Sequence, residues 1–408
     1  MDARSRRLIL AAVVVGLALR LAFGLLYWID KPLTHDEREY LALARSVAAG
    51  RGFTYGPEAA PGTAQQFGRA PGYPLFLAIL GVPPGEVMST PARVKIAQSL
   101  IGAAVVWLVA LIAARTLGRR AAVAAAAIAA VYPPLVWMCA YVLSETLFSL
   151  AALAAATALD AAMLRARSHR AGAAGMIAAG LLAGAATLVR PVMLFFLPLA
   201  LLWILRRRPA LAVAFLAAAA AVILPWTARN YRVHHRFVLV ASEGGVTFWT
   251  GNHPLARGDG DLAANPELKR AELAFRRSLP GLSAEELEPL YYRDALRRIT
   301  DRPGWWLTLV ARKAFYTVVP AGPSYTLHSR KYLVASVGSY ALLLPFALAG
   351  VRHVWRSATR PTALLLAAAS VLLASLVFFP QERFRIPVLD PTMIVCAAAL
   401  AAARAERS

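Results

Sequence analysis

The stretch 33-LTHDEREYLALARSVAAGRGF-53 places three ionisable side chains, His35, Asp36 and Glu37, directly after a long apolar run. Carboxylates at the start of a helix complement its dipole, and Thr34 is a suitable N-cap residue, so a helix beginning here explains the pair without any chemistry. A carboxylate sheltered at a membrane surface can also act as a general base, because desolvation raises its pKa. Asp36 is therefore the first catalytic candidate, and Glu37 is the weaker candidate beside it.

A further carboxylate, Glu145 in 141-YVLSETLF-148, stands at the start of another apolar run. An ionisable group at that depth is costly unless it has a partner or reaches water, so Glu145 is either an interfacial residue in water or part of a site. His35 and Asp36 could together ligate a divalent metal, but no paired spacing such as HxxxH accompanies them. A divalent metal stays an open alternative, and no other cofactor is expected.

Basic side chains recur next to apolar segments. Arginine forms bidentate hydrogen bonds with phosphate and keeps its charge when partly buried, so several such residues on one face predict a phosphate-bearing ligand. The alternative for any one of them is a side chain that reaches toward lipid headgroups. The substrate-binding candidates are Arg69 and Tyr73 in 68-GRAPGYP-74, Arg190 in 187-TLVRPVM-193, Arg312 and Lys313, and Arg383 and Arg385 in 380-PQERFRIP-387.

The composition is that of a membrane protein. The 408 residues are 59% hydrophobic and 16% charged, whereas a soluble domain carries about a quarter charged residues. The net charge is +22, from 44 basic and 22 acidic residues. Many basic residues form short clusters between apolar runs, as in cytoplasmic loops, and no basic face of a soluble domain is evident. The expected partners include the lipid bilayer and no nucleic acid.

Apolar runs close to the length needed to cross a bilayer recur along the chain. If every basic cluster lies in the cytoplasm, ten spans with both termini inside is the simplest arrangement. We therefore expect an all-α polytopic membrane protein of the single domain 1–408, with spans at 8–28, 94–114, 120–138, 143–163, 171–189, 191–205, 209–225, 331–350, 361–379 and 386–403.

Two sizeable loops, 29–93 and 226–330, then face the outside and carry the candidates from His35 to Tyr73 and the pair Arg312 and Lys313. Each contains an apolar stretch that is too short or too charged to cross, at 72–82 and 304–315, and we expect both as helices at the membrane surface. The second loop also contains 283-SAEELEPLYYRDALRRIT-300, in which a serine and a glutamate three residues apart form a capping-box pattern.

The order of these motifs along the chain resembles a known superfamily. The motifs are 36-DEREYLALARSVAAGRGF-53, 69-RAPGYPLFLAILG-81, 141-YVLSETLF-148, 188-LVRP-191, 225-PWTARNYRV-233 and 380-PQERFRIPVLDP-391, and they cover nearly the whole chain. They resemble the GT-C membrane glycosyltransferases, specifically bacterial proteins similar to the family 39 protein mannosyltransferases and the lipid A aminoarabinose transferases.

The resemblance implies an inverting transfer of one sugar from a polyprenyl-phosphate donor to a glycan, lipid or protein acceptor. The reaction would take place at the outer face of the bacterial cytoplasmic membrane. By resemblance, Asp36 is the essential acidic residue of the first outer loop, Glu37 supports it, Glu145 belongs to the cavity, and Arg69 with Arg383 or Arg385 holds the donor phosphate.

One position departs from the family pattern. The aminoarabinose transferases have a glutamate implicated in metal binding directly before the basic residue, whereas this chain has Gly68 before Arg69. The alternative function is a transporter or flippase of a lipid-linked or anionic solute. Such a protein is expected to show charges near the membrane midplane and repeat symmetry, and neither is visible in the sequence.

Overall fold

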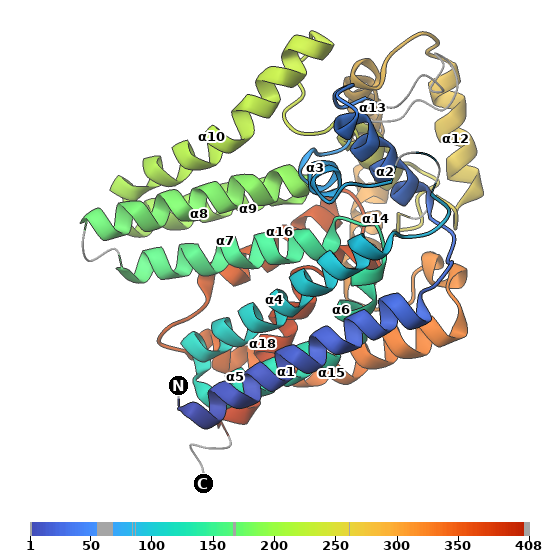
Figure 1. The fold of residues 1–408 in the computed structure, drawn as a ribbon. Helices are drawn as coiled ribbons and strands as arrows, with labels where there is room; N and C mark the ends of the chain where they lie inside the picture. Colours follow the sequence, from blue (N-terminus) through green and yellow to red (C-terminus); the bar gives the residue numbers. More distant parts are fainter. Residues whose placement is uncertain are drawn as a thin grey trace.

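The computed structural model describes residues 2–54, 68–83, 85, 87–165, 169–260 and 262–403. Every regular element among them is a helix, as expected for an all-α membrane protein. Six helices are long and apolar enough to cross a membrane. They are α1 (Ala3–Ala22, extended by the π-helical turn η1, Phe23–Tyr27), α4 (Ala92–Leu117), α7 (Glu145–Arg165), α8 (His169–Val189), α10 (Pro209–His234) and α15 (Arg330–Arg356), and they run roughly alongside one another in Figure 1.

The other four expected spans are also helical, but they are shorter or broken. The first is a pair bent by 61° that passes the same test when it is counted as one span. The exact number of ten spans therefore stays a prediction. The elements are α5 (Arg119–Val131) with α6 (Pro133–Trp137) and η2 (Met138–Ala140), then η3 (Pro191–Leu194) with α9 (Phe196–Arg207), α16 (Thr362–Val377) and α18 (Leu389–Ala403).

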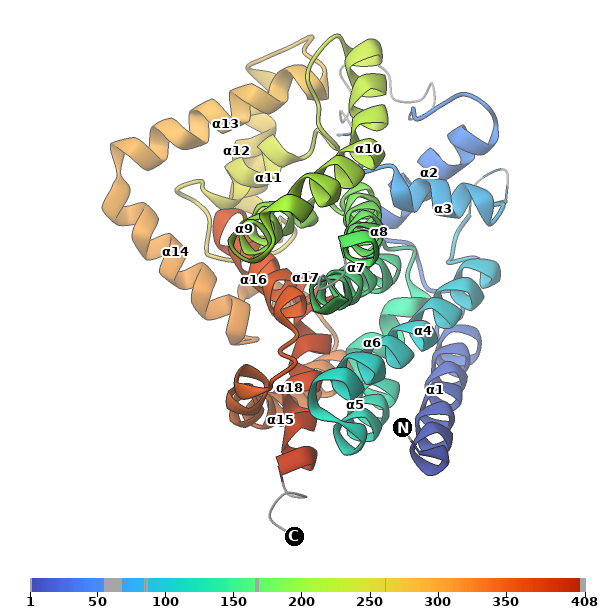
Figure 2. The ribbon, with the colours of Figure 1, turned by 90° about the vertical axis from the view of Figure 1, so that its left-hand side faces the viewer.

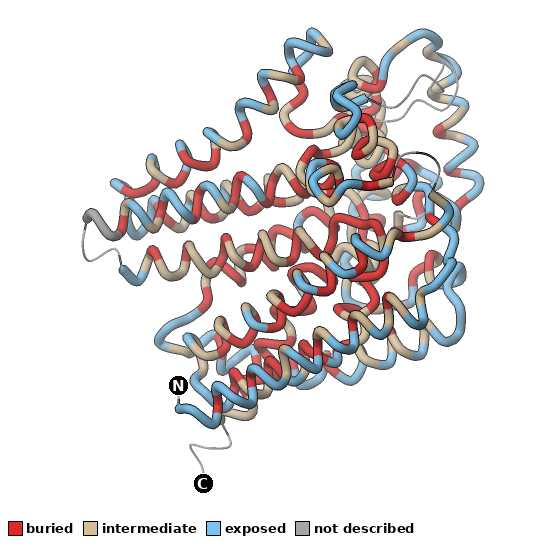
Figure 3. Tube along the Cα trace, in the orientation of Figure 1, coloured by how far each residue is buried: buried red, intermediate tan, exposed pale blue. Residues whose placement is uncertain are grey.

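Small residues let the spanning helices approach closely. A Cβ at Gly180 of α8 would lie 2.3 Å from the carbonyl oxygen of Phe215 in α10, and a Cβ at Gly350 of α15 would lie 1.7 Å from that of Cys396 in α18. Such contacts replace the hydrophobic effect, which is absent between helices in lipid. Buried residues accordingly concentrate on the inner helix faces, while the outer face of α1 is largely exposed (Figure 3).

Shorter helices gather at the end of the bundle opposite the chain termini (Figure 1). Two of them begin with capping boxes: Ser283 with Glu286, as expected, and Thr34, the expected N-cap residue, with Glu37. These helices are α2 (His35–Ala48), α3 (Gly72–Ile79), α11 (Gly244–Gly251), α12 (Pro266–Arg277), α13 (Ala284–Asp301), α14 (Pro303–Val318) and the 3-10 turn η4 (Pro323–Leu327).

Helix α10 is longer than the expected span 209–225, because it continues through Pro225 to His234. The extension is held by side chains of Trp226, Thr227 and Asn230, which donate to the backbone carbonyls of residues 240, 239 and 238 respectively. These bonds fold the start of the second outer loop back onto the helix. The loop therefore begins as an ordered continuation of the span.

Arg20 lies inside α1 and is almost fully buried. Its guanidinium donates to the carbonyl oxygens of Ala129 and Ala130, at 3.2 Å each, and to that of Gly16 at 2.8 Å. In a continuous helix the first two carbonyls would accept from the N–H groups of residues 133 and 134. Both of these residues are proline and have no N–H. Arg20 thus satisfies the two carbonyls that the break between α5 and α6 leaves free.

We expect Arg20→Met to lower the melting temperature of the purified protein strongly, because a buried carbonyl left without a donor costs about 1–3 kcal/mol. Arg7→Met on the same helix is the control, since Arg7 is exposed. Thermal unfolding of both variants in the same detergent measures the difference. Equal melting temperatures for the two variants would show that the contacts of Arg20 do not hold this junction.

Candidate active site

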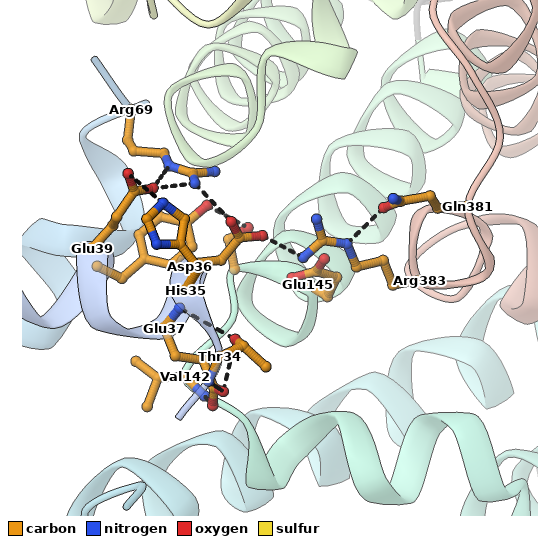
Figure 4. Close-up of polar contacts among 12 residues, drawn as sticks. Thr34, His35, Asp36, Glu37, Glu39, Arg69, Val142, Glu145, Gln381 and Arg383 are labelled. Carbon is orange, nitrogen blue, oxygen red and sulfur yellow. Dashed lines mark hydrogen bonds and ion pairs between the residues drawn. The ribbon is translucent and has the colours of Figure 1, made fainter. Parts of the chain in front are cut away.

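Asp36 lies in the first turn of α2 between two guanidinium groups from distant parts of the chain (Figure 4). Its Oδ1 accepts from Nη2 of Arg69 at 2.8 Å, and its Oδ2 accepts from Nη1 of Arg383 at 2.6 Å. Arg69 precedes α3 in the first outer loop, and Arg383 lies in the short helix α17 (Glu382–Arg385), after α16. The structure therefore brings together three of the predicted residues from separate parts of the chain.

Arg69 is surrounded by three carboxylates. Besides Asp36, it contacts Glu39, through Nε at 2.9 Å and through Nη2, and Glu243, through Nη1 at 3.1 Å. Its guanidinium carbon also lies 5.2 Å from the centre of the Tyr40 ring. The side chain is 15% exposed. Arg69 is thus a largely buried hub that neutralises acids from both outer loops.

A second ion pair lies beside this hub. Nη1 of Arg190, after α8, lies 2.7 Å from Oε1 of Glu145, at the start of α7, and donates to Oγ of Ser144 at 3.1 Å. The guanidiniums of Arg190 and Arg383 lie 5.1 and 5.3 Å from the same Phe384 ring. The five predicted residues Asp36, Arg69, Glu145, Arg190 and Arg383 therefore form one cluster, which we call the outer charge cluster together with Glu39 and Glu243.

Glu37 does not join the outer charge cluster. Its Oε2 accepts from the backbone N–H and hydroxyl of Thr34, and its Oε1 accepts from the backbone N–H of Val142 at 2.8 Å. The side chain is buried, so both oxygens have partners away from Asp36. These contacts give Glu37 a structural role, and they lend no support to its prediction as a catalytic residue. It caps α2 and fixes the segment before Glu145.

The two outer loops are joined next to Arg69. The backbone N–H of Gly68 donates to Oγ of Ser242 at 2.8 Å, and the backbone N–H of Ser242 donates to the carbonyl of Gly68 at 2.9 Å. Oγ of Ser242 in turn donates to Glu285 at 3.2 Å. Gly68 precedes Arg69 and Ser242 precedes Glu243, so this junction sets the distance between the two charged residues. The departure from the family pattern at Gly68 has a physical cause here, because a Cβ would lie 2.8 Å from the serine oxygen.

We expect Gly68→Ala to destabilise the loop junction by about 1–3 kcal/mol through overpacking. Ser242→Ala removes the oxygen that the new methyl group would meet, so the double variant should be more stable than the sum of the single changes predicts. Melting temperatures of the four proteins complete the cycle. Additive effects would mean that the two residues do not press on each other.

Burial and neighbouring charges act differently on the acids. Burial alone would raise the pKa of Asp36, but Arg383 and Arg69 outweigh it and hold the pKa of this carboxyl well below its usual range. Burial raises the pKa of Glu243, and Arg69 opposes this only in part. Asp36 is therefore an anion at any working pH, whereas Glu243 takes up a proton more easily. With all groups ionised, four carboxylates face three guanidiniums in the outer charge cluster.

Tyr73 and Arg385, two predicted substrate-binding residues, lie outside the outer charge cluster. Tyr73 is fully buried and donates to Oε1 of Gln98 at 3.1 Å, with its ring packed edge-on against Tyr40. Arg385 is buried with Nε 3.2 Å from Oδ1 of Asp390, and its guanidinium lies 3.6 Å from the centre of the Tyr340 ring. Tyr73 supports α2 from behind, and Arg385 ties α17 to α18 and α15.

Lys313 and Arg312 also lie apart from Asp36. Nζ of Lys313 is buried under α14 and donates to Oδ1 of Asn252 at 2.9 Å and to the carbonyls of Leu376 and Val377, in the last turn of α16, at 3.2 and 3.4 Å. Arg312, the preceding residue, is exposed. The structure therefore does not bring these two predicted substrate-binding residues into contact with Asp36, and their role stays a prediction. Lys313 instead docks α14 onto the end of α16.

The docking of Lys313 predicts a pH-dependent stability. Burial lowers the pKa of Lys313 from 10.5 to about 7 in the fold. The unfolded chain therefore binds a proton between pH 7 and 10.5 that the folded chain does not, so the stability contributed by this residue rises with pH in that window. The melting temperature of wild type should therefore rise relative to that of Lys313→Met from pH 7 to pH 10. Lys331→Met, at an exposed lysine, is the control and should show a constant difference; a constant difference for both variants would contradict the prediction.

Glu39 and Glu243 are cluster residues that the sequence predictions missed. Glu39 lies three residues after Asp36, a spacing that puts both carboxylates on one face of a helix, and this signal was available in the sequence. Glu243 precedes α11 in a loop with no periodic pattern, and only the folded contact with Arg69 reveals it.

The alternative of a divalent metal at His35 and Asp36 finds no grouping of ligands in the described part of the chain. Nowhere there do three His, Cys, Asp or Glu side chains come together so that they could hold a metal ion. His35 is 79% exposed, and its Nε2 lies 3.4 Å from Glu39. Asp36 directs both oxygens at arginines.

Known proteins resemble this chain in structure alone. No protein-family model matches the sequence, and no curated protein is similar to it. Among solved structures, oligosaccharyltransferase AglB from Archaeoglobus fulgidus, in complex with an inhibitory peptide and a dolichol-phosphate, has a TM-score of 0.57 at 15% identity, covering 99% of this chain and 51% of that one. The same enzyme tethered with an acceptor peptide has a TM-score of 0.59 at 15% identity, covering 100% and 50%.

ArnT from Cupriavidus metallidurans in the apo state gives a TM-score of 0.42 at 16% identity, covering 98% of this chain and 77% of that one, and this weaker similarity adds nothing to the fold assignment. The chain spans about half the length of the AglB chains that it matches. The similarity to AglB extends over all of its helices and confirms the expected fold class. The chain is a multi-pass membrane protein with the all-helical fold that these oligosaccharyltransferases have over about half of their length.

Proposed function

We propose that this protein is an integral membrane glycosyltransferase that moves a single sugar from a polyprenyl-phosphate donor to an acceptor, with inversion at the sugar carbon. The observation that carries the proposal is the carboxylate of Asp36 held between the guanidiniums of Arg69 and Arg383 at one end of a GT-C-type bundle. A base and a phosphate-binding cation are the two groups that such a transfer needs.

Arg383 is the cation best placed to receive the donor phosphate. Its side chain is 34% exposed, against 15% for Arg69, and it contacts a single carboxylate where Arg69 contacts three. Its Nε donates to Oε1 of Gln381 at 2.9 Å, and this bond holds the guanidinium in place. Phosphate departs as an anion when the bond between the sugar carbon and the phosphate oxygen breaks, and a guanidinium stabilises that charge.

Asp36 is proposed to take the proton of the acceptor hydroxyl as its oxygen forms the new bond to the sugar carbon. In the described arrangement Asp36 is a weak base, because two arginines lower its pKa. Donor binding changes this, since a phosphate on Arg383 removes one of the two partners and raises the pKa of Asp36. The donor therefore activates the base for its own transfer, and Arg69 keeps the carboxylate in position.

The distribution of charged residues supports the proposed location of the site. Contacts at one end of the bundle join the N-terminus and the segment after α15 to the end of α4 and the start of α5. Arg119 lies 3.0 Å from Asp2. Ser357 and Thr359 donate to the backbone carbonyls of residues 116 and 115. The outer charge cluster lies at the opposite end (Figure 1). With basic segments in the cytoplasm, the site faces the outer side of what we propose to be the bacterial cytoplasmic membrane.

Reconstitution tests the proposal. Purified protein in proteoliposomes is supplied with a panel of undecaprenyl-phosphate sugars and a membrane extract as acceptor, and the release of undecaprenyl phosphate is measured. We expect release with at least one donor and its loss in Asp36→Asn. If no donor is consumed, while the vesicles move lipid-linked sugar between leaflets in a way that Asp36→Asn abolishes, the protein is a flippase and the proposal fails.

A further inference from the structure

Helix α14 lies at the level where membrane helices end. Lys313 donates to the last-turn carbonyls of α16, at residues 376 and 377, which fixes α14 against that end. In Figure 2 the long helices α1, α7 and α8 are seen nearly end-on, whereas α14 is seen along its length at the edge of the molecule. The helix therefore lies across the bundle end, in the plane of the membrane surface.

The exposed face of α14 is apolar. Leu307, Phe315 and Val318 are 61%, 54% and 46% exposed, and their helical spacing places them on one side with Ala311 and Ala314. A helix that lies flat and presents such a face inserts it among lipid headgroups and the upper acyl chains. Only Thr308 and Arg312 interrupt this face with polar side chains.

A hollow of about 550 Å³ opens beside the same face. It lies between α14 and the segment that joins α11 to α12. Its lining residues are Arg257, Thr308, Ala311, Arg312, Phe315, Tyr316 and Pro323. Its two cations come from different parts of the chain. Gly258 allows this approach, because it has a φ of +99° and a Cβ there would lie 2.9 Å from Cβ of Arg312.

Neither Arg257 nor Arg312 forms an ion pair within the described residues. The nearby Asp259 is buried, and its Oδ2 accepts from the backbone N–H of Ser324 at 2.6 Å. The hollow thus combines the Thr308 hydroxyl and an apolar wall with two guanidiniums that have no ion-pair partner in the part of the chain that the structure describes. Phosphate oxygens are the ligands that guanidiniums bind best in a bidentate manner.

We propose that this hollow binds the phosphate headgroup of an anionic glycerophospholipid of the surrounding bilayer, at a site separate from the outer charge cluster. The two arginines hold the phosphate, and Ala311 and Phe315 contact the glycerol and the first carbons of the acyl chains. A bilayer lipid is favoured over the sugar donor, because the hollow opens at the molecular edge onto the lipid-facing side of α14. The proposal does not rest on transferase activity.

Native mass spectrometry of the full-length protein in detergent tests it, by titration with dioleoyl phosphatidylglycerol, dioleoyl phosphatidylcholine or undecaprenyl phosphate. The double variant Arg257→Gln/Arg312→Gln is compared with wild type and with Arg302→Gln, which removes an exposed arginine at the start of the same helix. We expect the double variant to bind phosphatidylglycerol about tenfold more weakly, with phosphatidylcholine binding unchanged and Arg302→Gln like wild type.

Melting temperatures of the three proteins establish that each is folded, and the single variants Arg257→Gln and Arg312→Gln should each show part of the loss. Equal binding of phosphatidylglycerol by the double variant and Arg302→Gln would overturn the proposal. A loss confined to undecaprenyl phosphate would also overturn it, because the hollow would then belong to the donor lipid. Neither result depends on whether sugar transfer is observed.

Discussion

Replacing Asp36 with asparagine is expected to lower the rate of sugar transfer by about 10²–10⁴-fold, the usual contribution of a positioned general base. Asparagine keeps the shape of the side chain but cannot accept the acceptor proton as a carboxylate does. The fold should persist, because Arg69 keeps Glu39 and Glu243 as partners and the start of α2 keeps its cap at Glu37. The measurement is the initial rate of undecaprenyl phosphate release, with the melting temperature taken for each protein.

Glu39→Gln is the matched control, since Glu39 lies one turn further along α2 and shares Arg69 with Asp36. It removes the same charge from the same hub and leaves the proposed base intact. We expect a rate loss at least ten times smaller than that of Asp36→Asn. Equal losses would indicate that Asp36 contributes only its charge to the hub, and the role of base would have to be reassigned to Glu243.

Most of the helices and half of the site could be predicted from the sequence because they follow from local patterns. Apolar runs, a capping box and basic clusters predicted the spans, both surface helices, α2 and α13, whereas α11 and α12 were not predicted. Asp36, Arg69 and Arg383 could be grouped because topology and the family resemblance put all three on the outer face. The number of spans could not be predicted, since a 61° bend such as that after α5 depends on packing by residues such as Arg20.

The remaining differences between prediction and structure have a common physical cause. The charge of a residue in an apolar segment can be balanced either by a bound ligand or by a buried side chain of the protein. The sequence does not distinguish between these two cases. Lys313, Arg385 and Glu37 each found partners in the fold. Glu243 shows the reverse case, in which a residue of an irregular loop reaches Arg69 next to the junction of two distant segments at Gly68 and Ser242.

Arg383→Gln is expected to reduce transfer by about 10²–10³-fold, the usual cost of removing one group that stabilises developing negative charge. Its melting temperature should stay close to that of wild type, because Arg383 neutralises one carboxylate that Arg69 also holds. Arg69→Gln provides the contrast, since it leaves three carboxylates without their shared cation. Breaking a buried pair in this way costs about 3–5 kcal/mol, so this variant should lose stability together with activity.

The pH profile separates a phosphate-binding role of Arg383 from a merely structural one. Arg383 helps to lower the pKa of Asp36, so its removal raises that pKa toward the ordinary range. A base works only when it is deprotonated. As the pH is lowered, Arg383→Gln should therefore lose activity at a higher pH than wild type does. Arg383→Lys restores the positive charge but not the planar guanidinium. It should bring the acid side of the pH profile back to that of wild type and recover only part of the rate. An acid limb that stays in place in Arg383→Gln would mean that the arginine does not tune the base, and that donor binding cannot activate Asp36 through it.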